Sequence, residues 1–235
     1  MERYPDVALP TTDSAHSVEA AGFLTTVYMW MFAGLALTTV VAWTVVETPY
    51  LDFVFNRTIF YGLLIGELLL VVVLSAAIGK ISSSVATGLF LLYSALNGLT
   101  LSIILLVYTG ESIMMAFLSA GCLFGTMSIY GYATKRDLTG WGSILFVGLI
   151  AVIICTIINL LLGSDRFTFI ISIVGVVVFL GLTAYDTQKI LKIGAQTAGG
   201  DAGLLRKAAI MGALALYLDF INLFLYMLRF MGKRK

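Results

Sequence analysis

The sequence predicts an all-α polytopic membrane protein with seven transmembrane helices. Its 235 residues are 60% hydrophobic and only 11% charged, whereas a soluble domain is usually about 25% charged. The apolar residues form seven runs, each near the roughly 20 residues that a helix needs to cross about 30 Å of hydrocarbon. A transmembrane β-barrel would instead show strands of about 10 residues that alternate polar with apolar side chains, and these runs do not alternate.

The expected spans are separated by short breaks that carry turn residues and charges. They cover residues 23–46, 58–79, 84–107, 112–133, 141–162, 167–190 and 208–231. We expect a polar N-terminal tail over residues 1–22, a single seven-helix domain over residues 23–231 and a basic C-terminal tail over residues 232–235. The acidic tail and the long first run favour a membrane helix over a cleaved signal peptide, which opens with positive charge and has a short apolar core.

Lysine and arginine residues in the short loops predict the orientation. With a cytoplasmic N-terminus, the inner side holds eight of the 14 basic residues, and most of the outer ones belong to the C-terminal end. Tail charges weigh less than loop charges, so we expect the N-terminus inside and the C-terminus outside. A six-span form with a re-entrant last segment is the alternative, and it would place both ends inside.

Three carboxylates lie inside the predicted spans with no lysine or arginine at mid-span. They are Glu67 near the middle of the second run, Asp186 in the sixth and Asp219 in the seventh. An ionised carboxylate in a bilayer costs roughly 2.5–3.5 kcal/mol on insertion scales, so such residues mark candidate functional sites. The remaining partners are a proton, a hydroxyl, another carboxylate or a bound cation.

Asp186 and Asp219 form a candidate proton and cation sensor if they face each other. Two close carboxylates titrate as a unit, because both cannot ionise easily. Protonated, the pair is held together by hydrogen bonds; deprotonated, it repels or takes up a divalent cation, and oxygen ligands suit Ca²⁺. The pairing requires similar depths, which we expect if the seventh helix enters the membrane nearer Gly212 than Ala208.

Both aspartates also have a plainer interpretation. Lys189 lies three residues after Asp186 on the same helical face, where a local salt bridge can form. Asp219 can be a protonated acid that is hydrogen-bonded to a backbone carbonyl, to Asn222 or to Tyr217.

Glu67 is a candidate relay or second site, and its plainer interpretation is a neutral acid bonded to a neighbouring helix. The polar neighbours of the aspartates, Tyr185, Tyr217 and Asn222, are candidate supporting residues.

Four stretches carry a family resemblance. Residues 181–190 contain Ala-Tyr-Asp, and residues 216–229 open with Leu-Tyr-Leu-Asp-Phe-Ile-Asn-Leu-Phe. Together with residues 92–101 and 131–138, they resemble the Bax inhibitor-1 family, the transmembrane Bax inhibitor motif proteins. The similarity covers most of the chain from Phe23 onward and is strongest to the bacterial inner-membrane members.

The resemblance implies a fold in which the last helix is central and the other six wrap it in two three-helix layers. It also implies a pH-sensitive calcium leak in the bacterial inner membrane, with Asp186 and Asp219 as the sensor and possible Ca²⁺ ligands. Bacterial members carry an acid and a base on the second helix; Glu67 is the candidate acid, and the nearest base, Lys80, lies at the helix end. Ca²⁺, H⁺ and the lipid bilayer are then the expected partners, with no cofactor.

Other functions fit the sequence less well. An intramembrane aspartyl protease also uses Tyr-Asp on one helix, as at Tyr185-Asp186, but this chain has no Gly-x-Gly-Asp around Asp219 and no proline after Pro49. We therefore expect no enzyme. A proton-coupled transporter and a non-conducting regulatory membrane protein remain as alternatives, and the net charge of +1 gives no sign of nucleic-acid binding.

Two small-xxx-small pairs, Gly62/Gly66 and Gly121/Gly125, are of the kind that lets helices approach closely. We expect them to pack helices within the chain, which favours a monomer over a homodimer.

Overall fold

Seven long helices and one short helix make up the regular structure of this computed structural model, which describes residues 12–197 and 199–235. The long helices are apolar enough to cross a membrane, which confirms the seven-helix prediction. They are α1 (Thr12–Val46), α3 (Arg57–Ala77), α4 (Ser83–Val107), α5 (Gly110–Ala133), α6 (Thr139–Leu162), α7 (Asp165–Gln196) and α8 (Ala202–Met231). The five-residue α2 (Tyr50–Val54), in the break after the first span, was not predicted.

Three helices extend beyond the apolar runs. Helix α1 begins at Thr12, inside the segment expected to be a polar tail, and residues 1–11 of that segment lie outside the described residues. Helix α7 continues to Gln196, and α8 already begins at Ala202. Composition marks only the lipid-embedded part of a helix, whereas the backbone can stay helical in water when its end is capped. Asp201 provides such a cap, because its side chain accepts hydrogen bonds from two backbone N–H groups of the first turn.

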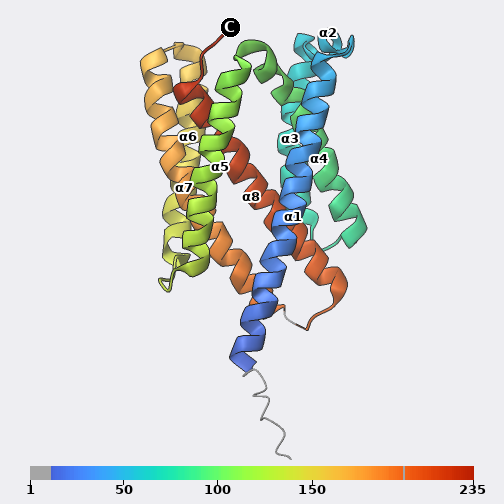
Figure 1. Ribbon diagram of the computed structural model, residues 1–235. Coiled ribbons are helices and arrows are strands. Elements are labelled where there is room, and N and C mark those ends of the chain that lie inside the picture. The colour runs from blue at the N-terminus through green and yellow to red at the C-terminus, as the bar shows by residue number, and fades with distance from the viewer. Residues whose placement is uncertain (1–11, 198) are drawn as a thin grey trace, which may run out of the picture.

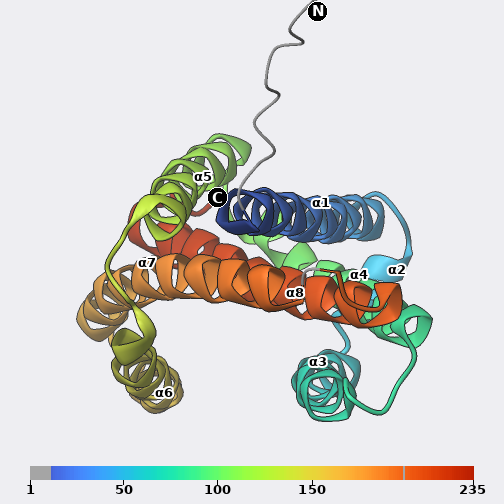
Figure 2. The ribbon, with the colours of Figure 1, turned by 90° about the horizontal axis from the view of Figure 1, so that it is seen from below.

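Helix α8 is the core of the molecule. It crosses the bundle diagonally behind α1 and α5 (Figure 1) and packs against α1, α4, α5 and α7. The outer helices α3 and α6 contact α4 and α7, respectively, and lie apart from each other when the bundle is seen from below (Figure 2). Four of the largest fully buried side chains within α8 are Leu214, Leu216, Tyr217 and Leu223.

The described chain starts and ends at opposite faces of the bundle. Helix α1 begins at the lower end in Figure 1, and residues 232–235 lie at the upper end. An odd number of spans requires this arrangement, and the re-entrant six-span alternative does not match it.

The glycine pairs do not pack helices within the chain, so that prediction was wrong. A Cβ atom built on Gly62, Gly66, Gly121 or Gly125 would meet no atom within 4 Å. The close approach lies elsewhere: a Cβ on Gly131 of α5 would collide with the backbone of Ala184 in α7. Gly131 therefore lets α5 seat directly on the segment of α7 that carries Asp186.

Candidate functional site

Asp186 of α7 and Asp219 of α8 lie side by side inside the bundle. Their carboxyl groups are close enough to share a hydrogen bond. Asp219 is 4% exposed, and its Oδ2 atom has no hydrogen-bond partner among the described residues. A buried oxygen without a donor is costly unless one of the two carboxyl groups is protonated or a cation is present.

The tilt of α8 brings these two residues to the same depth. Asp186 lies ten residues before the end of α7, and Asp219 lies seventeen residues after the start of α8. At 1.5 Å per residue these are about 15 and 26 Å along the helices, but α8 runs obliquely (Figure 1), so its rise across the bundle is smaller. The expectation that the seventh span enters the membrane near Gly212 stays a prediction, and the tilt of α8 accounts for the match in depth without it.

Lys189 does not neutralise Asp186 by an ion pair. Its Nζ atom lies 5.8 Å from the centre of the Tyr185 ring. Across the ranges that the structure describes, the single salt bridge joins Lys192 to Asp137, at the end of α7. Tyr185 itself packs against the backbone of Gly142 in α6, where a Cβ atom would collide with its ring.

The polar neighbours of Asp219 in the sequence bond elsewhere. Asn222 donates a 2.8 Å hydrogen bond to the carbonyl of Leu218. The Tyr217 hydroxyl pairs with the Thr38 hydroxyl at 2.7 Å and donates to Asn97 Oδ1 at 3.2 Å. Neither side chain supplies the donor that Asp219 Oδ2 lacks, and Tyr217 belongs instead to the surroundings of Glu67.

Glu67 has two donors. Its Oε1 accepts from the Thr100 hydroxyl at 2.8 Å, and its Oε2 accepts from Asn97 Nδ2 at 3.3 Å. Sequence reasoning did not identify Asn97 or Thr100 as part of this site. Their spacing held a signal, because polar residues three apart in an apolar run share one helix face, and Ser94 extends the same row.

A cavity of about 360 Å³ opens beside Glu67, between α3, α4 and α8. Its polar lining comes from Glu67, Asn97, Thr100, Asn222 and Arg229. It lies towards the C-terminal end of α8. The three intramembrane acids thus form two separate sites: the aspartate pair, and Glu67 in a polar cavity.

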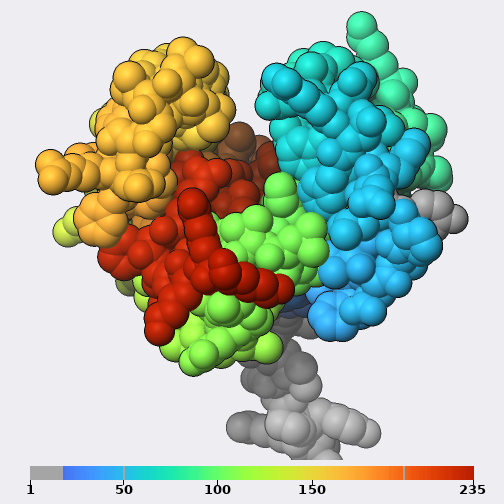
Figure 3. All heavy atoms as spheres, turned by 90° about the horizontal axis from the view of Figure 1, so that it is seen from above, coloured from blue at the N-terminus to red at the C-terminus, as the bar shows by residue number. Residues whose placement is uncertain are grey.

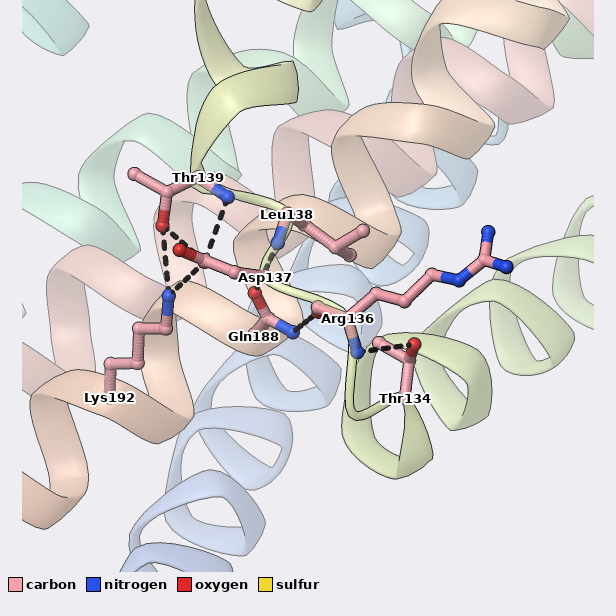
Figure 4. Close-up of polar contacts among 7 residues, drawn as sticks. All are labelled: Thr134, Arg136, Asp137, Leu138, Thr139, Gln188 and Lys192. Carbon is pink, nitrogen blue, oxygen red and sulfur yellow. Dashed lines mark hydrogen bonds and ion pairs between the residues drawn. The ribbon is translucent and has the colours of Figure 1, made fainter.

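The loop between α5 and α6 is hydrogen-bonded to Gln188 and Lys192 of α7 (Figure 4), and Gln188 lies two residues after Asp186 in the sequence. Gln188 Nε2 donates to the Arg136 carbonyl, and its Oε1 accepts from the Leu138 N–H, both at 2.8 Å. Lys192 Nζ donates to Asp137 Oδ1 at 2.5 Å. The Lys192 bond, with hydrogen bonds from Thr139, holds the pKa of the Asp137 carboxyl well below its usual range, so this group stays ionised at neutral pH.

The fold and these acids define a class of protein. It is a helical multi-pass membrane protein in which two neighbouring acids lie between the last two helices, without a salt bridge to a basic side chain among the described residues. The family described as "Inhibitor of apoptosis-promoting Bax1" matches residues 20–235. The chain therefore belongs to the Bax inhibitor-1 family, as the sequence motifs predicted.

Similar proteins occur across distant bacteria. The inner membrane protein YbhL of Escherichia coli K12 is 49% identical over 215 residues, covering 91% of this chain and 92% of YbhL. An uncharacterized protein of Borreliella burgdorferi is 44% identical over 216 residues, covering 91% and 92% of the two chains. The uncharacterized protein RP147 of Rickettsia prowazekii is 40% identical over 214 residues, covering 91% and 90%.

Proposed function

We propose that this protein is a pH-sensitive calcium leak channel of the bacterial inner membrane, with its N-terminus in the cytoplasm. The observation that carries the proposal is the diacid: two carboxyl groups meet inside the bundle, and one buried oxygen has no donor. Family membership and the similarity to an inner membrane protein support the location.

Protons would hold the channel closed. With at least one proton on the pair, a carboxyl O–H of one aspartate donates to the other and ties α7 to α8. When the pair is deprotonated, two negative charges face each other in a medium of low dielectric and repel. Separation of α7 from α8 then loosens the core, because α8 contacts four other helices.

Calcium would interact with the deprotonated pair only weakly. Across the described residues there is no group of three or more acidic, histidine or cysteine side chains that could hold a metal ion. Two carboxylates supply part of the six to eight oxygen ligands that Ca²⁺ prefers, and water or carbonyl groups would supply the rest. Such a site suits an ion that passes through rather than one that stays bound.

Glu67 would serve as a second acidic station on the path. Its cavity lies on the C-terminal side of α8, opposite the cytoplasmic end under the expected orientation. Tyr217 links the two sites, because its hydroxyl contacts Asn97 of the Glu67 cluster and its backbone lies two residues before Asp219.

Calcium flux into liposomes tests the proposal. The purified protein would be reconstituted, and Ca²⁺ influx followed from pH 6 to pH 8 for the wild type, Asp186→Asn and Asp219→Asn. Asp165→Asn is the matched control, because Asp165 is an exposed acid at the far end of the same helix α7. Between pH 6 and pH 8, we expect Ca²⁺ influx through the wild type and the control to rise about tenfold or more, since a titrating group changes its protonation ratio about tenfold per pH unit. Both Asn variants should stay nearly flat.

Each other outcome points to a different function. If the wild type passes no Ca²⁺ at any pH, the leak is excluded and a non-conducting regulatory role is favoured. If a solute moves only when a proton gradient is imposed, the protein is a proton-coupled transporter. If both Asn variants keep the wild-type pH response, the diacid is not the sensor.

A further inference from the structure

An apolar groove runs along the side of the bundle between α1 and α5, with α8 as its floor. The half nearest the C-terminus is a cavity of about 410 Å³, whose apolar lining includes Ala42, Trp43, Phe117 and Phe220. A second cavity of about 420 Å³ continues the groove toward the other end of the bundle and shares Phe220. Gly121 and Gly125 line this second part, where open space above their Cα atoms keeps the groove wide. The groove faces the lipid, so an acyl chain fits its shape and chemistry.

The basic C-terminal residues are fixed at the upper mouth of this groove. The Lys233 N–H donates to Ser112 Oγ at 2.9 Å, and the Lys233 carbonyl accepts from the Thr109 N–H at 3.2 Å. The Lys235 N–H donates to the Val107 carbonyl at 2.9 Å. These bonds hold residues 232–235 across the turn between α4 and α5, and Figure 3 shows this segment lying over α5 at the top of the bundle.

The same turn forms one wall of the groove. Leu105 and Gly110, on either side of it, both line the cavity, and Lys235 Nζ donates to the Leu105 carbonyl at 2.7 Å. Backbone bonding therefore holds the basic tail beside the opening, and the Lys235 ammonium group contacts the wall of the groove.

These cations have no carboxylate partner. Lys233, Arg234 and Lys235 are exposed, and within residues 12–197 and 199–235 the only ion pair is the distant one at Asp137. Glu111, in the first turn of α5 next to the turn that the tail crosses, forms no ion pair with them. Three basic side chains that form no ion pair attract anionic lipids at a membrane surface.

Trp43 adds an interfacial anchor at the same level. Its side chain is 62% exposed at the upper end of α1 and lines the groove opposite α5. Tryptophan prefers the headgroup region of a bilayer, where the indole ring meets lipid and its N–H meets polar atoms. The tail, the groove and Trp43 together provide a cationic head site above an apolar slot.

We propose that this groove binds one anionic phospholipid, with an acyl chain between α1 and α5 and its phosphate at Lys233, Arg234 and Lys235. The inference can be tested apart from calcium flux, because neither the three basic residues nor Gly110 belongs to the diacid or lines the cavity beside Glu67. The ligand is a lipid rather than free phosphate, since the cations and the apolar slot adjoin.

Native mass spectrometry with phosphatidylglycerol and phosphatidylcholine as probes tests the proposal on the full chain. The main variant replaces Lys233, Arg234 and Lys235 with Gln, which keeps the backbone bonds of the tail. Its control replaces Arg57, Lys80 and Lys135 with Gln, because these exposed cations lie away from the groove. A second variant, Gly110→Leu, fills the mouth of the slot at a position whose Cβ meets no neighbour within 4 Å.

We expect the wild type and the control to retain phosphatidylglycerol over phosphatidylcholine. The main variant should lose affinity for phosphatidylglycerol by about fivefold per charge removed, and Gly110→Leu should weaken both lipids. Added glycerol 3-phosphate should not compete. The proposal is overturned if the two lipids bind the wild type equally, or if the control loses as much affinity as the main variant. It is also overturned if glycerol 3-phosphate displaces the lipid. If Gly110→Leu only converts a dimer to a monomer, the groove is an interface between copies and the proposal is wrong.

Discussion

Glu67 and Asp219 are both buried carboxylates of the bundle, yet their surroundings differ. Each Glu67 oxygen accepts a hydrogen bond, from Thr100 or from Asn97. Asp219 has a buried oxygen with no donor and a second acid, Asp186, as its neighbour. The first arrangement satisfies a carboxyl group in one fixed geometry, whereas the second depends on what the solution supplies. The proposed function therefore assigns the response to protons and cations to the aspartate pair and not to Glu67.

The difference arises from the helices that face each acid. Helix α4 presents a polar row to Glu67, including Asn97 and Thr100. Helix α7 presents Asp186 to Asp219, and the nearby Lys189 lies over the Tyr185 ring instead. Three substitutions test this contrast. One removes the carboxyl group of Glu67, one gives position 219 a hydrogen-bond donor, and one alters Asp137, which has Lys192 as its basic partner.

The largest change in stability is expected at Glu67. Glu67→Ala leaves the Asn97 amide with only a long contact to the Tyr93 hydroxyl and the Thr100 hydroxyl with only the Asn97 carbonyl. Loss of the two bonds to the carboxylate should cost about 1–3 kcal/mol of unfolding free energy. Glu67→Gln retains one carbonyl oxygen and should cost clearly less. Unfolding in detergent micelles measures both, and equal losses for the two variants would show that the two donors do not matter.

Asp219→Asn should act in the opposite direction. Its new amide N–H₂ can donate to Asp186, so the missing donor is supplied and the unfolding free energy at pH 8 should rise by about 0.5–1.5 kcal/mol. The same unfolding assay measures the change. A loss of stability comparable to that of Glu67→Ala would mean that Asp219 makes bonds of the same kind as Glu67, and the contrast would fail.

The smallest effect is expected at the clamp between the α5–α6 loop and α7. Asp137→Asn removes an exposed ion pair with Lys192, so global unfolding should change little, while amide hydrogen exchange near Leu138 should quicken. The lowered pKa of Asp137 means that the pair contributes above the ordinary aspartate pKa and is lost only in more acidic solution. The exchange difference should therefore be the same at pH 6 and pH 8 and should shrink in high salt. A difference that appears only at one of these two pH values would contradict this.

The sequence predicted those features that depend on composition and on local motif. The lipid-embedded lengths of the spans follow from apolar runs, and the acids stood out because no base shares their depth. The sequence did not reveal the donors to Glu67, because they depend on how α3 packs on α4. The tilt of α8 and the Lys192–Asp137 bridge, which joins residues 55 apart, are likewise set by tertiary packing and carry no local signal.

The position of α8 has a consequence for the order in which the protein is assembled. The helix that fills the core is the last of the seven to leave the ribosome, and chains are made at about 5–20 residues per second. Until then, α1, α4, α5 and α7 present to one another the faces that α8 will cover. The core therefore cannot form until α8 has been inserted, and side-chain packing is completed only when Asp219 reaches Asp186.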